Sequence, residues 1–585
     1  MPTLKLLNKN TLSLSCTYED KDKAKSINSY RWNKASRSWL YPFRRDIVDS
    51  ILKTFPHVLF FEEVKEAYQQ DKRFYELSQS IKQQGNCQVE SLTKLPLRNY
   101  QKVGVKFLSL FDKAALFDDM GLGKTIQSLY FALYNKSQAH KCLILCPKSV
   151  KISVWANQIE KFTDEKYIIV EGSTLKREKL YDKFLYGDYY FLISSYETYR
   201  VSFPILKKMS LIKSIDPKKS NDDIEFGNGI NLMVLDEATK IKNYQAQITK
   251  CILKTKLKFA LLLTGTPYWN RVEDIYTQIQ FIKPGLLGST FWAFQDKYLK
   301  KGGYGGHEII GYQNLDELKE KVESISIRRE KSEVQEIPDK IYERRILDLD
   351  DPEQKKDYET MRDELIVWVK TLDDQEIKVK AQELLTRNLR LSQIADGFLS
   401  SVELNSVKYY DRGSKFKEID TIINDYALTH QIVIFSRFLA IIDFLVKKYS
   451  CEPYYAVDLQ GKMKDEQRAE AINSFQKGKS RIFISQIQTG GMGIDLSCAD
   501  IQIFIDKAFI APGTLRQAED RSHRFGLKNK LSIISLICKG TIDYRWESLM
   551  RKKQKQIGKI FPSGGIKIER RMKIEREDWL DLLKK

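Results

Sequence analysis

Residues 11–18, TLSLSCTY, alternate between apolar and polar side chains, which is the period of a half-buried strand. The segment 30–43 predicts two further strands, because a polar loop separates YRW from WLYPF. Apolar side chains then recur at helical spacing over 47–55, and VLFF at 58–61 predicts a last strand. Residues 1–90 are therefore expected to form a small α+β module.

The pattern changes at about residue 91, where continuous apolar runs begin to alternate with helical stretches. Such runs are typical of strands in a parallel sheet that is covered on both faces. The first set is AALF (114–117), CLILC (142–146), YIIV (167–170), FLIS (191–194), LMVL (232–235) and ALLL (260–263). The second set is IVIF (432–435), YYAV (454–457), RIFIS (481–485), IQIFI (501–505) and LSIISLI (531–537). The predicted fold class is α/β, with two parallel-sheet lobes and helical insertions after the small α+β domain.

Shifts in composition predict where the domains begin and end. The region between the two sets of strands is charged and helical, the stretch 201–229 has the polar composition of an exposed insertion, and the C-terminal region is basic. The predicted domains are the N-terminal module (1–90), the first lobe (91–335), a helical insertion or linker (336–415), the second lobe (416–560) and a basic C-terminal tail (561–585).

The charge balance favours a partner that carries phosphates. Lys and Arg number 97 against 77 Asp and Glu, so the formal net charge is +20. Such a surplus creates a positive field suited to a nucleic-acid backbone, although a Lys-rich surface can also be merely solvated.

Membrane, secretion and metal chemistry are not expected. No apolar run approaches the roughly 20 residues that span a bilayer, and the N-terminus does not resemble a secretory signal. We therefore expect an intracellular protein, located in the cytoplasm or nucleoid, or in the nucleus of a eukaryote. The eight cysteines form no CxxC pair, so neither disulfides nor zinc are expected. Cys142 and Cys146 flank an apolar run and are interpreted as buried thiols on or beside a strand.

A glycine-rich turn, DDMGLGKT (118–125), lies between an apolar run and a helical pattern. Backbone N–H groups of such a turn can close around phosphates at the N-terminus of the helix. Lys124 would reach the β- and γ-phosphates of ATP, and the Thr125 hydroxyl would hold Mg²⁺. Asp118 stands where the general pattern GxxxxGK[ST] has its first glycine, which weakens the motif taken alone. The predicted ATP-binding residues of this turn are Met120, Gly121, Leu122, Gly123, Lys124 and Thr125.

Two further elements of the sequence carry candidate catalytic groups. Asp236 and Glu237 follow the apolar run LMVL, which places both at the carboxyl edge of the predicted sheet. Asp236 would position Mg²⁺ and Glu237 would polarise the attacking water, although acidic turns after strands are also common. In QAEDRSHRFG (517–526), Arg521 and Arg524 are expected on one face of a helix, either as arginine fingers or as structural salt-bridge partners.

As a set, the motifs resemble the Snf2-type ATPases of helicase superfamily 2. The main ones, in chain order, are DDMGLGKT, DEAT, LTGTP (263–267), GGMGIDL (490–496) and QAEDRSHRFG. Further matches are LRNYQ (97–101), LCPKSV (145–150), ISSYET (193–198), IRREKSEVQEIPDK (327–340), IFSRF (434–438) and GTID (540–543). The resemblance covers about 91–560 and implies two RecA-like lobes that use ATP and Mg²⁺. One departure is Thr239, which stands where the family usually has His. Asp118 is no departure, because the family commonly has Asp or Glu there.

The resemblance also implies roles for residues whose spacing alone predicts none. In the nucleotide site these residues are Gln101, which would read the adenine base, and Gly491, Gly493 and Asp495, which would lie where the second lobe meets ATP and nucleic acid. Residues expected to couple the γ-phosphate state to lobe closure are Thr264, Thr266 and Gln517. Residues expected to hold phosphates of the tracked strand are Lys148, Ser149 and Ser195.

The N-terminal module resembles, more faintly, the small domain that precedes the motor in HARP-containing annealing helicases. Its aromatic residues, Trp32 and Trp39 among them, are interleaved with arginines and lysines. Such a mixture suits stacking on unpaired bases and binding of phosphates, and it equally suits a tryptophan core beneath a solvated basic loop.

Together these features predict a DNA-dependent ATPase that translocates on double-stranded DNA and remodels or reanneals branched DNA. Three alternatives remain open from the sequence. The first is a strand-separating helicase or an RNA motor, the second is a DNA-binding scaffold without activity, and the third is a remodeller that displaces proteins. The intact candidate catalytic residues argue against the scaffold. No histone-reading module is recognisable in the sequence, which argues against the remodeller.

Overall fold

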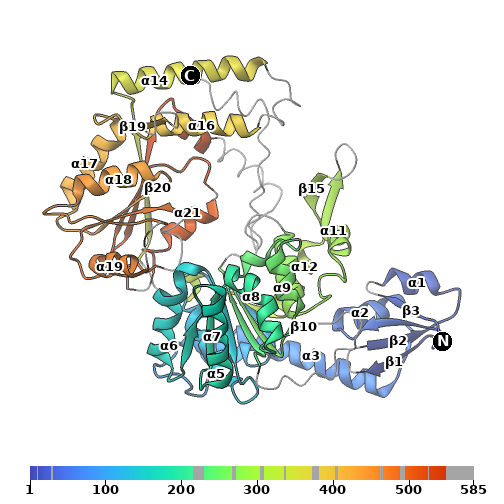
Figure 1. Ribbon diagram of the computed structural model, residues 1–585. Coiled ribbons are helices and arrows are strands. Elements are labelled where there is room, and N and C mark those ends of the chain that lie inside the picture. The colour runs from blue at the N-terminus through green and yellow to red at the C-terminus, as the bar shows by residue number, and fades with distance from the viewer. Residues whose placement is uncertain are drawn as a thin grey trace. The chain divides into compact units, whose positions relative to one another are not determined.

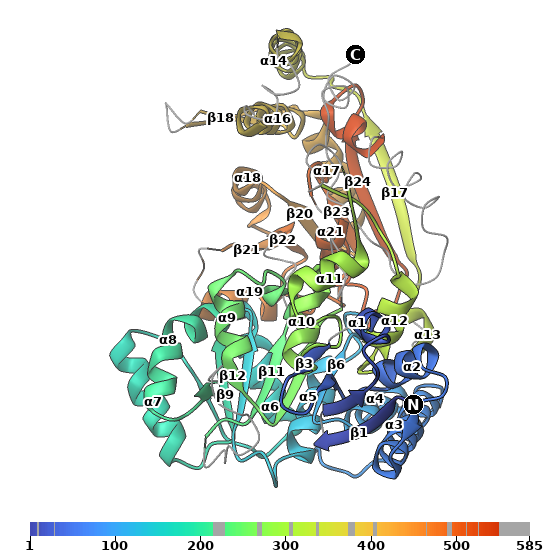
Figure 2. The same ribbon diagram turned by 90° about the vertical axis from the view of Figure 1, so that its right-hand side faces the viewer.

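The computed structural model describes residues 1–8, 11–27, 30–214, 229–265, 272–302, 308–334, 338–371, 381–401, 406–461, 463, 465–487, 494–510, 512–524 and 526–548. These residues form two compact units (Figures 1 and 2). The first unit contains the described residues of 1–146, 158–267 and 272–329, and the second contains those of 147–157 and of 330 onward.

The N-terminal module of the first unit is a five-stranded sheet with helices. Its strands are β1 (Thr3–Asn8), β2 (Thr11–Ser15), β3 (Arg31–Asn33), β4 (Ser38–Pro42) and β5 (Leu59–Phe60), in the order β3-β4-β2-β1-β5. Its helices are α1 (Lys21–Ser26), α2 (Arg45–Thr54) and α3 (Glu62–Lys82). The strands and the helix predicted between residues 11 and 61 are present, and the structure adds β1. The core lies where the apolar face of α2, with Ile47, Val48 and Ile51, packs on the sheet.

The first lobe is built on a seven-stranded parallel sheet. Its strands are β6 (Lys113–Leu116), β7 (Cys142–Cys146), β8 (Tyr167–Ile169), β9 (Phe191–Ser195), β11 (Leu232–Asp236), β13 (Phe259–Leu263) and β16 (Ser326–Ile327). They lie in the order β16-β6-β13-β11-β7-β9-β8, and every neighbouring pair is parallel. Both Cys142 and Cys146 are buried in β7, as predicted.

The helices of the first lobe connect these strands. They are α4 (Asn99–Leu108), α5 (Lys124–Tyr134), α6 (Asn157–Phe162), α7 (Thr174–Tyr186), α8 (Tyr196–Lys208), η3 (Ala238–Ile241), α9 (Gln247–Lys254), α10 (Asp274–Ile282), α11 (Phe291–Tyr298) and α12 (Leu315–Glu323). Two small antiparallel pairs accompany them, β10 (Lys213–Ser214) with β12 (Thr255–Lys256) and β14 (Leu299–Gly302) with β15 (Glu308–Tyr312). The expected insertion at 201–229 begins within α8, and residues 215–228 lie outside the described residues.

Charged side chains join the N-terminal module to the first lobe. Lys321 of α12 lies 2.9 Å from the carboxylate of Asp46, and Arg45 pairs with Glu320 at 3.2 Å. The Arg44 guanidinium also donates to a backbone carbonyl of the lobe, that of Gly285. The module and the lobe therefore belong to one compact unit.

The second unit contains a six-stranded parallel sheet in the order β17-β24-β23-β20-β22-β21. The strands are β17 (Lys340–Leu347), β20 (Ile432–Ser436), β21 (Val457–Leu459), β22 (Ile482–Gln486), β23 (Ile501–Phe504) and β24 (Leu531–Cys538). The helices are α13 (Lys331–Val334), α14 (Pro352–Thr371), α16 (Ala381–Ala395), α17 (Ser414–Tyr426), α18 (Leu439–Tyr449), α19 (Asp465–Gln476) and α21 (Pro512–Glu519). A hairpin of β18 (Phe398–Ser401) and β19 (Ser406–Tyr409) follows α16, and η1 (Lys148–Val150) with η2 (Lys151–Ala156) are also grouped with this unit.

The two parallel sheets confirm the α/β fold class predicted from the apolar runs. Two elements differ from the predictions. The range 336–415 was expected to be helical, and it also contains β17, a strand of the second sheet. The strand expected at 454–457 begins at Val457, because Tyr454 and Tyr455 both donate their backbone N–H to Cys451 in a turn at 3.1 Å.

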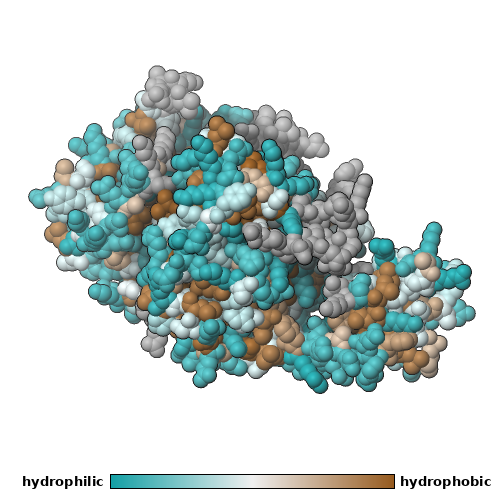
Figure 3. Space-filling model, turned by 60° about the horizontal axis from the view of Figure 1, so that its bottom comes forward, coloured by the Kyte–Doolittle hydropathy of each residue, from teal (hydrophilic) through white to brown (hydrophobic). Residues whose placement is uncertain are grey.

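The surface agrees with the high proportion of charged residues. On the face drawn in Figure 3, hydrophilic side chains predominate, and hydrophobic ones appear in small patches between them. None of the helices that the structure describes has the length and apolar character that a membrane crossing requires.

A buried ion triad fastens the helical segment α14–α16 to the second sheet. The Lys415 ammonium lies 2.6 Å from both Asp396 and Asp543, and it also donates to the carbonyl of Ile505 at 2.8 Å. Burial opposes the charge, but the two carboxylates raise the pKa of Lys415 above its usual value. The triad therefore joins the end of α16, the start of α17 and the segment after β24.

Replacing Lys415 with alanine would leave two buried carboxylates without their cation. Breaking a buried pair in this way costs about 3–5 kcal/mol, so Lys415→Ala is expected to lower the free energy of unfolding by that amount. Lys417→Ala is the matched control, because Lys417 lies on the same helix and is exposed. Chemical denaturation of both variants measures the difference, and equal midpoints would contradict the role of the triad.

Candidate functional site

The glycine-rich turn connects the carboxyl end of β6 to the first residue of α5. Gly121 and Gly123 have φ angles of 88° and 69°, a left-handed conformation that glycine adopts without steric cost. Gly123 is the N-cap of α5, so the turn ends at the positive end of the helix. A Cβ atom on Gly123 would lie 2.4 Å from the Gln101 amide nitrogen. Left-handed glycines at the N-terminus of a helix are the backbone arrangement that a phosphate-binding turn uses.

Lys124 lies folded onto this turn. Its ammonium donates to the carbonyl oxygens of Asp118 and Asp119 at 2.8 and 3.1 Å. Burial lowers the pKa of Lys124, and the carboxylates of Glu237, Asp118, Asp236 and Asp119 oppose that shift. Because the hydrogen bonds of the Lys124 ammonium go to neutral carbonyl groups, it can exchange them for bonds to phosphate oxygens.

Gln101 connects α4 to the same turn. Its amide oxygen accepts a hydrogen bond from the Arg98 backbone N–H at 3.0 Å, and its amide nitrogen donates to the Leu122 carbonyl at 3.3 Å. The hydroxyl of Tyr100 donates to the same carbonyl at 3.2 Å. The residue expected to read the adenine base is therefore in direct contact with the turn expected to hold the phosphates.

Asp236 and Glu237 lie at the carboxyl edge of the same sheet. Asp236 is the last residue of β11, and β13 lies between β11 and β6. Glu237 has a φ of 54°, a conformation that is unfavourable for a residue with a side chain and that often marks functional sites. The buried Tyr196 hydroxyl donates to the Asp236 carbonyl at 2.7 Å and supports this turn. The structure thus brings Lys124 together with both carboxylates.

These residues fit ATP and Mg²⁺. The glycine cradle suits phosphates, because a Cβ atom at Gly123 would fill part of it. The Thr125 hydroxyl, in the first turn of α5, and the Asp236 carboxylate supply oxygen ligands, which Mg²⁺ prefers.

The segment after β13 also reaches the turn. Thr264 is buried directly after the strand, and a Cβ atom on Gly265 would lie 3.1 Å from the Met120 side chain. Thr264 is therefore placed beside the nucleotide site, where a coupling role is expected of it. Thr266 lies outside the described residues.

In the second unit, the segment with the candidate arginine fingers is not helical throughout. The predicted helix, α21, ends at Glu519, so Arg521 and Arg524 lie in the turns that follow it. Directly after the helix, Asp520 is buried, and its carboxylate is bound by Lys340 and Lys331 at 3.0 and 3.1 Å. Arg524 donates from Nε to the Asp520 carbonyl at 3.0 Å, and Arg521 is buried.

The other predicted residues of the second lobe lie around this segment. Gln517 is half-buried on α21, and Asp495 is exposed and accepts the Ser497 backbone N–H at 3.0 Å. The Asp495 and Asp520 carboxylates oppose the effect of burial, which lowers the pKa of Arg524. Gly491 and Gly493 lie outside the described residues.

The residues expected to bind phosphates of a nucleic-acid strand follow two neighbouring strands, β7 and β9. Lys148 is exposed in η1, and the buried hydroxyl of Ser149 has no hydrogen-bond partner among the described residues. Ser195 is buried, and its hydroxyl accepts the Thr198 N–H at 3.1 Å as the N-cap of α8. A phosphate contact at Ser195 would therefore use the N-terminus of α8 rather than a free hydroxyl.

The two tryptophans of the N-terminal module have different environments. Trp39 is 7% exposed and packs in the core of the module, whereas Trp32 on β3 is 44% exposed. Their rings lie 4.8 Å apart, and the ring of Tyr30 packs edge-on against Trp39 at 5.5 Å. Trp32 and Tyr30 are therefore the aromatic faces that a base could reach, with Trp39 as their support.

One charged residue beside the candidate nucleotide site was not predicted from the sequence. Arg329, the second arginine of IRRE, donates from Nε to the buried Asp118 carboxylate at 2.9 Å. The available signal was the acidic residue in place of the first P-loop glycine, because a buried carboxylate requires a cation. The partner is 211 residues away and cannot be identified from local patterns.

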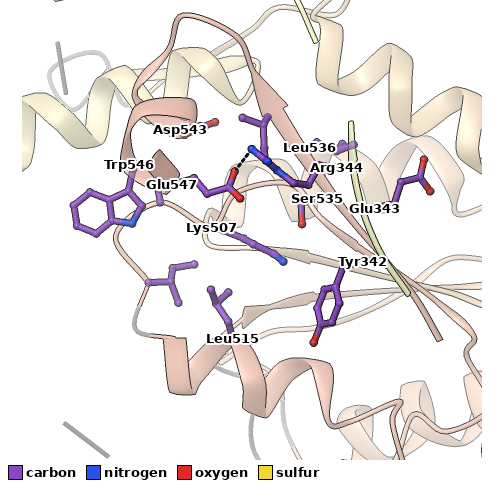
Figure 4. A pocket seen from close by; sticks show the side chains of 13 residues that line it. Tyr342, Glu343, Arg344, Lys507, Leu515, Ser535, Leu536, Asp543, Trp546 and Glu547 are labelled. Atoms are coloured by element: carbon purple, nitrogen blue, oxygen red, sulfur yellow. Dashed lines mark hydrogen bonds and ion pairs between the residues drawn. The ribbon is translucent and has the colours of Figure 1, made fainter. Parts of the chain in front are cut away.

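A pocket of about 340 Å³ lies in the second unit, between β17, β24 and α21 (Figure 4). An ion pair between Arg344 and Glu547, 2.8 Å apart, lies on its wall beside Trp546 and Lys507. None of the residues predicted to bind ATP or nucleic acid lines this pocket.

Comparison with known families identifies the class of protein. The model of the SNF2-related domain matches residues 100–397, and that of the helicase conserved C-terminal domain matches residues 414–526. The chain therefore belongs to the SNF2-related family of ATP hydrolases.

Individual relatives cover most of this chain. An uncharacterized ATP-dependent helicase of Mycoplasma pneumoniae is 29% identical over 79% of the chain and 42% of its own length. The DNA annealing helicase and endonuclease ZRANB3 of Bos taurus is 26% identical over 78% of the chain and 40% of its own length. The chain thus spans about two fifths of the length of these relatives. A solved structure, the Sulfolobus solfataricus SWI2/SNF2 ATPase core in complex with dsDNA, is 26% identical with a TM-score of 0.37 and covers 81% of this chain and 95% of its own.

Gly123→Ala tests whether the left-handed turn is needed for nucleotide binding. The variant is expected to relax out of a conformation that costs roughly 1–2 kcal/mol for a residue with a Cβ atom, and binding must then restore it. The affinity for a fluorescent ATP analogue should fall roughly tenfold, since 1.4 kcal/mol corresponds to a factor of ten. Gly85→Ala is the control, because a Cβ atom there meets nothing within 4 Å. Equal affinities of the two variants would refute the prediction.

Proposed function

We propose that the chain is a DNA-dependent ATPase that uses Mg²⁺, translocates on double-stranded DNA and remodels or reanneals branched DNA. The observation that carries the proposal is the convergence of Lys124, Asp236 and Glu237 at one edge of a parallel sheet, beside a glycine cradle. Family membership and the order of the motifs support the same reading.

The chemistry at this edge divides among the side chains. Lys124 binds the β- and γ-phosphate oxygens, while Thr125 and Asp236 would hold Mg²⁺, which neutralises phosphate charge when bound. Glu237 orients the attacking water and accepts its proton. Arg521 and Arg524 supply positive charge to the departing γ-phosphate, and Thr264 responds to its presence.

A nucleic-acid track is supported by charge and by relatives. The net charge of +20 favours binding to a phosphate backbone, which is independent of sequence and sensitive to salt. Relatives include proteins named as DNA helicases, such as the probable ATP-dependent DNA helicase CHR23 of Arabidopsis thaliana, 27% identical over 80% of the chain and 44% of its own length. Duplex DNA is proposed as the track because Snf2-type motors usually move along a duplex without separating it.

The N-terminal module supports the choice of branched DNA. Trp32 and Tyr30 are both about half exposed at β3, among basic residues such as Arg31 and Lys34. Aromatic faces beside cations bind unpaired bases and the phosphates that connect them. Because charged contacts join the module to the first lobe, a junction bound there stays beside the motor.

The experiment is a steady-state ATPase measurement with no nucleic acid, duplex DNA, forked DNA, single-stranded DNA or RNA. Duplex and forked DNA are expected to stimulate most. Lys124→Ala should lose at least about 100-fold in rate, the scale of removing one preorganised group from an active site. If only RNA or single-stranded DNA stimulates ATP hydrolysis, the nucleic acid on which the protein moves is not duplex DNA. Absence of hydrolysis in every condition would refute the proposal.

The forked substrate also tests the N-terminal module in the same assay. Trp32→Ala should remove any excess of fork over duplex stimulation and leave the duplex response unchanged. Tyr18→Ala is the matched control, an aromatic residue of the same module that is 80% exposed. A fork preference that survives Trp32→Ala would exclude stacking on this ring.

A further inference from the structure

The last residues of the first unit, 325–329, pair with β6 and with the start of the glycine-rich turn 118–125, which is called the P-loop below. The backbone N–H groups of Ala115, Phe117 and Asp119 donate to carbonyls at residues 325, 327 and 329, at 3.0, 2.8 and 3.0 Å. The pairing thus continues past the end of β6 and β16 and into the glycine-rich turn. Residue 329 is the last of the first unit. Backbone hydrogen bonds therefore join residues 325–329 to the beginning of the P-loop.

The side chain of Arg329 strengthens this attachment. Its guanidinium binds both oxygens of the Asp118 carboxylate, with Nε 2.9 Å from Oδ1, and donates to the Gln127 side chain at 2.7 Å and to the Tyr100 carbonyl. Gln127 in turn donates to Asp118 at 3.1 Å. Asp118 is completely buried, so this fork of hydrogen bonds is shielded from water. One side chain thus links the P-loop turn with α4 and α5.

A glycine inside α4 makes room for this arginine. A Cβ atom on Gly104 would lie 2.0 Å from the Gln127 amide oxygen and 2.5 Å from Nη2 of Arg329. Glycine inside a helix is unfavourable compared with alanine, so its presence here has a packing reason. That reason is the Gln127 side chain together with the buried guanidinium to which it is hydrogen-bonded.

Two residues later, the chain is fastened to the arginine-bearing segment of the second unit. The Lys331 ammonium lies 3.1 Å from the Asp520 carboxylate and donates to the His523 carbonyl at 2.6 Å. Lys340 binds the same carboxylate at 3.0 Å, and the His523 ring lies 2.9 Å from the Pro338 carbonyl. These contacts all lie within the second unit. They enclose the segment that contains Arg521 and Arg524.

We infer that residues 329–331 form a tether that links the conformation of the P-loop to that of the segment 520–524. Arg329 and Lys331 are its positioning residues. Two residues of extended chain span at most about 7 Å, so a displacement of one attachment is passed to the other. The tether rests on the proposed function, because it assumes that Arg521 and Arg524 act on ATP held at the turn.

The second-unit attachment is tested with Lys331→Gln in the full chain. The Kd for a fluorescent ATP analogue should stay within about twofold of wild type, while the DNA-stimulated kcat falls about tenfold. The loss should not add to that of Arg524→Gln, because both changes act through one segment. Lys331→Arg keeps the cation and is expected to restore most of the rate. Lys448→Gln is the control, an ion-paired lysine of the same unit whose partner is Asp420.

The first-unit attachment is tested with Gly104→Ala. Alanine ordinarily stabilises a helix relative to glycine, but here its Cβ atom would crowd Gln127, displace Arg329 and lower kcat about tenfold. Because crowding a buried ion pair also lowers stability, kcat is compared at a temperature at which circular dichroism shows the variant folded. Arg177→Gln is the control, because this arginine of the first lobe also donates to a backbone carbonyl but lies at the surface.

The outcomes separate the tether from the proposed function. The tether would be overturned if Lys331→Gln had the kcat of wild type, or if its loss of kcat multiplied with that of Arg524→Gln. Either result leaves the ATPase assignment intact as long as the wild type hydrolyses ATP. Full activity of Lys124→Ala would instead refute the proposed function. Lys331→Arg keeps the test valid if Lys331→Gln does not fold, because a rate tenfold below wild type in a folded Lys331→Arg would also contradict the role of the cation.

Discussion

The parallel order of β6, β13 and β11 is the constraint on which the candidate site depends. Carboxyl ends of parallel strands meet at one edge of a sheet, so the residues that follow these three strands converge although they are far apart in the chain. The P-loop follows β6, Thr264 follows β13, and Asp236 ends β11. The continuous apolar sequence of each strand, buried on both faces, is what holds this edge in place.

Buried ion pairs are the second feature that occurs in both units. Asp118 pairs with Arg329 at the P-loop, and Lys415 pairs with Asp396 and Asp543 where α16 meets the second sheet. Each buried ion is costly unless it is paired, so such groups tolerate few alternative arrangements of their segments. In the first unit this accounts for an acidic residue where other P-loops have glycine.

Much of the fold and of the site could be predicted from local sequence, and the rest depends on distant partners. Continuous apolar runs predicted the central strands, and the glycine and acidic residues after those runs predicted the edge of the sheet at which the candidate site lies. The strand β17, KIYERRIL, was not predicted, because an edge strand with exposed charged side chains lacks an apolar run. The contacts of Asp520 and of Arg329 could not be predicted, because each is an ion pair between segments that are remote in sequence, which no periodicity records.

Displacement of a third strand from a DNA triplex tests the proposal that the protein moves along duplex DNA with energy from ATP. The substrate carries a triplex-forming oligonucleotide beside a stretch of plain duplex, and release of the oligonucleotide is followed with and without ATP. We expect ATP-dependent release of the oligonucleotide while the two strands of the duplex stay paired. Separation of the duplex strands, or no release despite DNA-stimulated hydrolysis, would contradict it.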